Sequence, residues 1–147
     1  KISYPARNEE KIIMDSQDRI LSAKAEKVIR PADIQRVRKI IDSIYVDEKL
    51  KEYILDIVSA TRDPEKYGLN LKRLISFGCS PRASICLLKA AKANAFLQHK
   101  GFVSPDDVKM VIMDVLRHRL AVSYEAEAEG MSAENVLQKI LDGIIVP

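Results

Sequence analysis

An arginine at the expected start of a helix is the residue in this sequence best placed to do chemistry. In the segment GCSPR, Ser80 is typical of a helix N-cap and Pro81 of the first helical position. Arg82 then lies in the first turn, where free N–H groups and the helix dipole repel a cation and attract an anion. Such an arginine either extends into water or shares an anionic partner with the helix end, and the residues alone leave both interpretations open.

The other titratable groups have simpler explanations. Asp47-Glu48 follows the apolar run 44–46, a pattern that imitates the magnesium-binding strand end of nucleotide hydrolases. Acidic residues at the start of a helix also cap it, and we favour this interpretation for Asp47 and Glu48. His99 and His118 have no companion at ligand spacing, so no metal site is expected. Arg117-His118-Arg119 closes another expected helix, where cations complement the dipole, and no chemical role is assigned to these three residues.

Composition excludes several classes of function. The 147 residues, 47% hydrophobic and 31% charged, suit one soluble globular domain, and a net charge of +3 is too small to indicate nucleic-acid or membrane binding. None of the five glycines belongs to a phosphate-binding loop, so we expect no catalytic residue here and no ATP hydrolysis by this chain alone. Cys79 and Cys86 lack a catalytic motif and are interpreted as reduced thiols, with Cys86 filling the core.

Apolar spacing predicts a mainly all-α protein, a small bundle of about six helices. In the central helix, which Gly101 should end, Ile85, Leu88 and Phe96 are expected to be largely buried. Asp47, Ser104 and Ser132 are the expected caps of three other helices. The predicted helices cover residues 6–16, 31–45, 47–62, 80–100, 104–119 and 132–141.

The connections between these helices are predicted to be mostly irregular. Residues 17–27 are expected to form a surface loop, and residues 67–77 an irregular connection. Short β pairs are expected at most near Val28 or over residues 120–123, where the pattern alternates. The acidic segment 123–130 is interpreted as a solvated edge.

Several of these stretches together resemble one family. GCSPRASICLLKAAKANAFLQHKGFVSPDDVK, DVLRHRLAVSYEAEAEG and SAENVLQKIL closely resemble the C-terminal lid of MoxR-type AAA+ ATPases, and YPARNEE and RPADI…YVDEKL also match. The resemblance implies a lead-in helix and linker over residues 1–27 and a helical lid over 28–147, with an absent upstream core that carries the Walker motifs. It gives Arg82, supported by Ser80 and Pro81, the role of the sensor-2 arginine that reaches the γ-phosphate of ATP. Cys79 stands where the family more often has alanine, and no role carries over to residues 117–119.

The same resemblance implies the setting in which the lid works. It implies a full-length ATP hydrolase that uses ATP and Mg²⁺, with the metal bound by the absent core, and a lid that converts nucleotide state into domain movement. The expected partners are its own core, the neighbouring subunits of a ring that is often a hexamer, and proteins with von Willebrand factor A domains. The whole protein is expected to be a cytoplasmic, chaperone-like assembly factor. Neither nucleic-acid binding nor membrane insertion is expected. Two alternatives remain: a helical DNA-binding regulator, suggested by Arg36, Arg38 and Lys39, and a purely structural adaptor.

Overall fold

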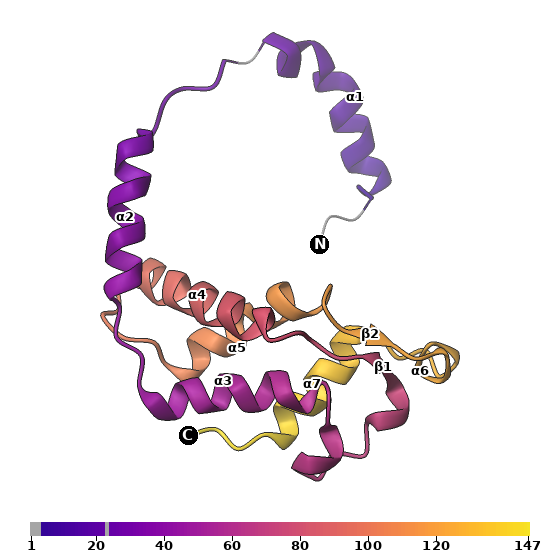
Figure 1. Cartoon of the computed structure of the whole chain (residues 1–147). Coiled ribbons are helices and arrows are strands. Elements are labelled where there is room, and N and C mark those ends of the chain that lie inside the picture. The colour runs from indigo at the N-terminus through magenta and orange to yellow at the C-terminus, as the bar shows by residue number, and fades with distance from the viewer. Residues whose placement is uncertain (1–3, 23) are drawn as a thin grey trace. The chain divides into compact units, whose positions relative to one another are not determined.

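Helices dominate the structure, as the apolar spacing predicts. The computed structural model describes the backbone of residues 4–22 and 24–147, and the side chains of these residues except 17–22. The chain divides into two compact units, Lys1–Val37 and Arg38–Pro147. Figure 1 labels the helices and the two strands. None of the described helices is long and apolar enough to cross a membrane.

The first unit holds a longer helix than the sequence predicts. Helix α1 (Arg7–Ser22) continues past the expected end near Ser16 into the predicted loop 17–27. No glycine or proline occurs between Pro5 and Pro31, so no strong helix breaker lies at the expected end near Ser16. Val28 lies in a segment without strand structure. Helix α2 (Pro31–Ser43) forms where predicted, but its described side chains include no buried residue.

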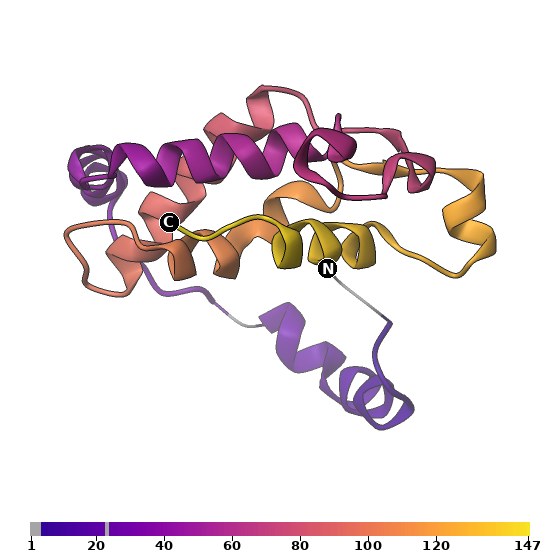
Figure 2. The same ribbon diagram turned by 90° about the horizontal axis from the view of Figure 1, so that it is seen from below.

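The second unit is built on α4, which packs most extensively against α5 and also against α3, while α7 packs against both α3 and α5. Figure 2 shows α7 running alongside α3. The helices of this arrangement are α3 (Glu48–Ala60), α4 (Arg82–Leu97), α5 (Pro105–Leu116) and α7 (Ala133–Gly143). The prediction of a small helical bundle is therefore confirmed.

Helices α3 and α4 run antiparallel. The N–H of Cys79, just before α4, donates to Thr61 Oγ1 at the end of α3 with an N···O distance of 2.8 Å. Beyond the other end of α4, the N–H of Val103 donates to the carbonyl of Tyr45, just before α3. Hydrogen bonds at both ends thus fix the start of α4 beside the end of α3.

The buried face of α4 differs from the predicted one. Ile85 is 57% exposed, so the prediction that it is largely buried is wrong, whereas Leu88 and Phe96 are partly buried and pack against the core. The buried positions recur every fourth residue, which places them on one side of the helix. Three of them are alanines, so α5 can approach the backbone of α4 closely. These buried residues are Ala83, Leu87, Ala91 and Ala95.

Helix α4 ends through a different residue from the one expected. His99, and not Gly101, adopts the left-handed conformation, with φ of 57°. The N–H of Lys100 then donates to the carbonyl of Ala95 at 2.9 Å, a bond that satisfies a free carbonyl at the helix end. Gly101 follows this turn and has open space around its Cα.

A small sheet and its neighbours complete the second unit. Strand β1 (Ile75–Phe77) pairs antiparallel with β2 (Ala121–Val122), so the expected short β pair is confirmed at β2. The partner strand lies in the predicted irregular connection, together with the 3-10 helices η1 (Pro64–Tyr67) and η2 (Lys72–Leu74). Figure 1 shows the sheet beside α6 (Tyr124–Ala128).

The acidic segment 123–130 forms a short helix and not the expected edge. Ser123 caps α6 because its Oγ accepts a hydrogen bond from the N–H of Ala126 at 3.2 Å. The same hydroxyl donates to the carbonyl of Arg73 at 2.6 Å, which ties α6 to η2. Local capping therefore overrides the alternating pattern of the acidic residues.

Candidate functional site

The backbone that leads into α4 is anchored to the end of α3. Thr61 is fully buried; its hydroxyl donates to the carbonyl of Val58 at 2.6 Å and accepts from the N–H of Cys79. A Cβ placed on Gly78 would lie 2.3 Å from the carbonyl oxygen of Thr61, which is closer than real Cβ atoms come. Only glycine therefore permits this approach, and the approach fixes where α4 begins.

A glycine-to-alanine pair tests this anchor. Gly78→Ala is expected to lower the free energy of unfolding by about 1–3 kcal/mol, because backbone atoms of Thr61 must move. Gly101→Ala is the matched control: nothing lies near its Cβ, so stability should stay the same or rise slightly. Urea denaturation of the two variants measures the difference, and equal stabilities would show that the contact between Gly78 and Thr61 is unimportant.

Arg82 is the first residue of α4 and is exposed. Its side chain has no hydrogen bond or ion pair with any residue that the structure describes. Pro81 has helical angles (φ −56°, ψ −26°) as predicted, and the carbonyl of Ser80 accepts from the N–H of Ala83 at 2.8 Å. However, no side chain caps the start of α4, so the predicted role of the Ser80 hydroxyl is wrong. In this first turn the N–H groups of Ala83 and Ser84 donate to the carbonyls of Ser80 and Pro81, which leaves the N–H of Arg82 for an anion.

The thiol of Cys79 is buried, and the charges of two arginines act on it. Burial raises the pKa of this thiol, whereas hydrogen bonding with Thr61 and the guanidiniums of Arg119 and Arg62 act in the opposite direction. The net effect is a higher pKa, so Cys79 is a neutral core residue at physiological pH. Arg119 and Arg62, from two other segments, therefore lie near enough to the start of α4 to act on this thiol.

Two arginines of the RHR segment cap α5 in the same way. The Nε atoms of Arg117 and Arg119 donate to the carbonyls of Met113 and Val115 at 2.8 and 2.9 Å. These bonds confirm that cations complement the end of this helix. His118 between them is exposed.

The two arginines differ in their remaining contacts. Arg117 forms ion pairs with Asp114 at 3.0 Å and Glu134 at 3.6 Å. Arg119 instead places Nη2 at 3.7 Å from the Sγ of Cys86 on α4. The spacing of residues 117–119 predicts their proximity to the helix end, but it gives no sign that they face different neighbours.

The acidic pair at residues 47 and 48 is confirmed as a helix start. Asp47 accepts from the N–H of Lys49 at 2.9 Å, and Glu48 forms an ion pair with Lys51 at 2.7 Å. Among the described residues no three acidic, histidine or cysteine side chains cluster as a metal site requires. Asp47 and Glu48 thus take part in contacts of the first turn of α3.

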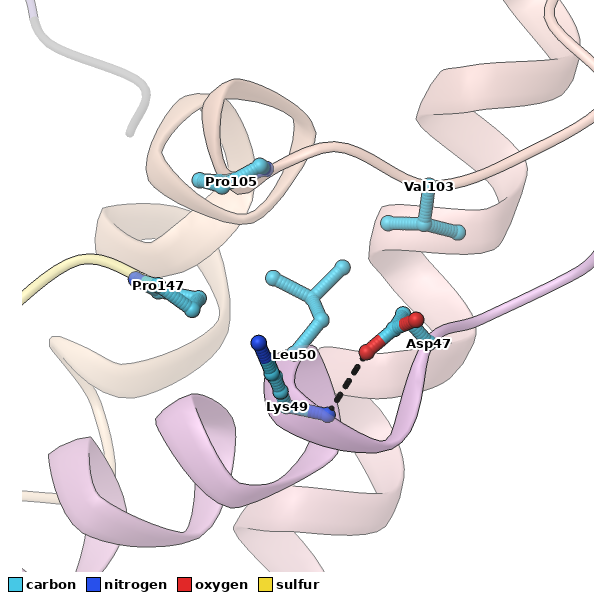
Figure 3. Close-up of a pocket in the computed structure, with 6 residues that line it drawn as sticks. All are labelled: Asp47, Lys49, Leu50, Val103, Pro105 and Pro147. Carbon is cyan, nitrogen blue, oxygen red and sulfur yellow. Dashed lines mark hydrogen bonds between the residues drawn. The ribbon is translucent and has the colours of Figure 1, made fainter.

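A pocket at the start of α3 offers little chemistry. It has a volume of about 250 Å³, and Figure 3 shows the carboxylate of Asp47 bonded to the backbone N–H of Lys49. The side chains of Leu50, Val103, Pro105 and Pro147 that line it are apolar, and Lys49 adds one ammonium group. This pocket lies beyond the opposite end of α4 from Arg82, and a 16-residue helix is about 24 Å long. It is therefore separate from the candidate anion site.

Comparisons with known proteins match the region that contains this site. Residues 69–140 match the family described as AAA lid domain. The chaperone MoxR1 of Mycobacterium tuberculosis is 35% identical over 99% of this chain, and the protein MoxR of Paracoccus denitrificans is 38% identical over 56% of it. A crystal structure of a candidate ATPase from Cytophaga hutchinsonii is 34% identical and covers 99% of this chain with a TM-score of 0.87. The chain is a lid of the MoxR family of AAA+ ATPases.

The MoxR-type lid spans only part of its relatives. It covers 39% of the Mycobacterium tuberculosis chaperone and 45% of the Cytophaga hutchinsonii chain. The matched region 69–140 of this lid includes Arg82 and the RHR segment. Sequence reasoning identified Arg82 but missed the anchor at Thr61 and the contact of Arg119 with Cys86. The single signal for the anchor was the glycine at position 78.

Proposed function

We propose that this lid covers the nucleotide bound to an AAA+ core and that Arg82 is its sensor-2 arginine. One observation supports the proposal most directly: Arg82 is exposed at the start of α4 and has no partner among the described residues. A guanidinium can bridge two phosphate oxygens, and the positive end of the helix dipole adds to the potential there. The residues therefore fit a phosphate group at this position.

The proposed mechanism depends on the charge of the γ-phosphate. ATP has this group and ADP lacks it, so Arg82 interacts more strongly with ATP. The anchor between Gly78, Cys79 and Thr61 attaches the backbone before Arg82 to the end of α3, so a displacement of the guanidinium is transmitted to α3. Hydrolysis is thereby coupled to movement of the lid, a hinge type of switch. Magnesium would be bound by the core.

The family also defines the proposed setting. We propose that the lid contacts its own core and neighbouring subunits of a ring, in a cytoplasmic chaperone-like assembly factor with von Willebrand factor A domain partners. The name of the Mycobacterium tuberculosis relative, a chaperone, supports this part of the proposal. The DNA-binding alternative gains no support, because Arg36 lies 3.8 Å from Asp33 in an ion pair on the same helix.

Arg82→Ala in the full-length ATPase tests the sensor role. Contacts to charged groups are worth about 1.5–3 kcal/mol, so ATP turnover or ATP affinity should fall roughly tenfold to a hundredfold, and ADP affinity should change much less. Stability should change little, because a cation at a helix N-terminus opposes the dipole.

Lys89→Ala removes another exposed cation of α4 and is the control. It should leave turnover and the ratio of ATP to ADP affinity unchanged. If Arg82→Ala also leaves both unchanged, the sensor assignment is wrong; if it unfolds the lid, Arg82 is structural.

A further inference from the structure

Arg119 faces the same side of α4 as Arg82. Its Nη2 lies 3.7 Å from the Sγ of Cys86, and Cys86 follows Arg82 by four residues. Residues four apart lie on one face of a helix, one turn apart, and helical side chains lean toward the N-terminus. The guanidinium of Arg119 therefore lies over the first turns of α4.

The position of Arg119 is fixed from a second element. Its Nε donates to the carbonyl of Val115 at 2.9 Å, and the side chain is half-buried. Its charge also acts on the thiol of Cys79, which precedes Arg82 by three residues. The guanidinium is thus in contact with Cys86, after Arg82 in the sequence, and near enough to Cys79, before it, to influence the pKa of that thiol.

No carboxylate compensates this charge among the residues that the structure describes. A guanidinium has five N–H donors, and Arg119 uses them on one carbonyl and on one sulfur, a weak acceptor. Arg117, two residues earlier, makes the equivalent carbonyl bond but also forms ion pairs with Asp114 and Glu134. Two guanidiniums without a carboxylate partner on one helix face repel each other. An anion with several oxygens bound between them would remove this electrostatic repulsion.

We propose that Arg119 is a second phosphate-binding residue, which contacts the phosphate chain of the nucleotide together with Arg82. This inference rests on the proposed function of Arg82, because that role places the phosphates at the start of α4. Arg119 then adds affinity for polyphosphate, and its attachment to α5 transmits the contact to a second helix of the lid.

Arg119→Ala and Arg117→Ala in the full-length ATPase form a matched pair. Both variants lose one bond to the end of α5, so any loss of helix capping is shared. Arg119→Ala should weaken MgATP binding about tenfold to a hundredfold, the usual range for a bond to a charged group. Arg117→Ala should bind MgATP as the wild type does. Arg119→Lys keeps the charge and should recover part of the affinity.

Fluorescence titration with MgATP and with AMP separates phosphate contact from a general structural effect. AMP lacks the β- and γ-phosphates, so its affinity should be the same in wild type and Arg119→Ala. Equal loss of ATP affinity in Arg117→Ala and Arg119→Ala, or equal loss for ATP and AMP, would overturn the proposal.

Arg82→Ala distinguishes this inference from the proposed function. If Arg82→Ala weakens ATP binding and Arg119→Ala does not, Arg119 has no phosphate role and the sensor assignment stands. If only Arg119→Ala weakens it, the phosphate contact of Arg119 is supported and the sensor assignment fails.

Discussion

Leu87→Ala is expected to lower the free energy of unfolding by about 2–5 kcal/mol, the range for removing a fully buried leucine side chain. Leu87 has no exposed surface and lies on the buried side of α4 with Ala83, Ala91 and Ala95, and α4 packs most extensively against α5. The alanines are too small to fill the cavity that the substitution leaves, so the site cannot collapse easily. Chemical denaturation of the 147-residue chain, followed by circular dichroism, measures the change.

Ile85→Ala is the control for this prediction. It lies two residues earlier on the same helix and removes a side chain of the same size, but that side chain is 57% exposed. Ile85→Ala should therefore lower the free energy of unfolding by much less than Leu87→Ala. Similar costs at the two positions would mean that α4 is buried on both faces, against the packing described here.

Asp107→Asn is expected to cost about 3 kcal/mol of stability. The carboxylate is 1% exposed and accepts hydrogen bonds from Asn94, Lys100 and Ser104, with N···O distances of 2.9–3.2 Å and an O···O distance of 2.7 Å to the Ser104 hydroxyl. Removing one partner of a buried ion pair costs about 3–5 kcal/mol, and the lower value applies because the partner ammonium of Lys100 reaches solvent. An amide also turns an NH₂ donor toward groups that are themselves donors.

The same substitution should change how stability depends on pH. Burial acts to raise the pKa of Asp107, but the bonds from Ser104, Lys100 and Asn94 outweigh it, so the pKa is lowered. The unfolded chain therefore binds this proton at higher pH than the folded chain. The stabilisation is fully present above the ordinary aspartate pKa of about 3.9 and is lost as the pH falls through the lowered value.

Asp106→Asn is the control for both effects of the Asp107 substitution. Asp106 lies in the same first turn of α5 but is exposed, so the change should cost only a few tenths of a kcal/mol through the helix dipole. Denaturation of both variants at pH 7 and at pH 3 measures the two effects. A wild-type acid dependence retained in Asp107→Asn would show that another carboxylate is responsible.

Features that depend on a few neighbouring residues could be predicted from the sequence. Asp47, Ser104 and Ser132 begin helices as expected, because a cap and its partner lie within three residues of each other. The exposed position of Arg82 at a helix start is also local, since Pro81 fixes it. The sequence thus determined the helical class of the protein and the placement of its candidate phosphate-binding arginine.

Tertiary structure alone decided which apolar residues are buried and which charges meet. Helix α4 is apolar on almost every side, so the choice of Leu87 over Ile85 depends on where α5 packs. The anchor of Cys79 on Thr61 joins residues 18 positions apart, and the contact of Arg119 with Cys86 joins residues 33 apart. No periodicity reports such pairs, because they form only when separate helices pack together and bring distant side chains to one place.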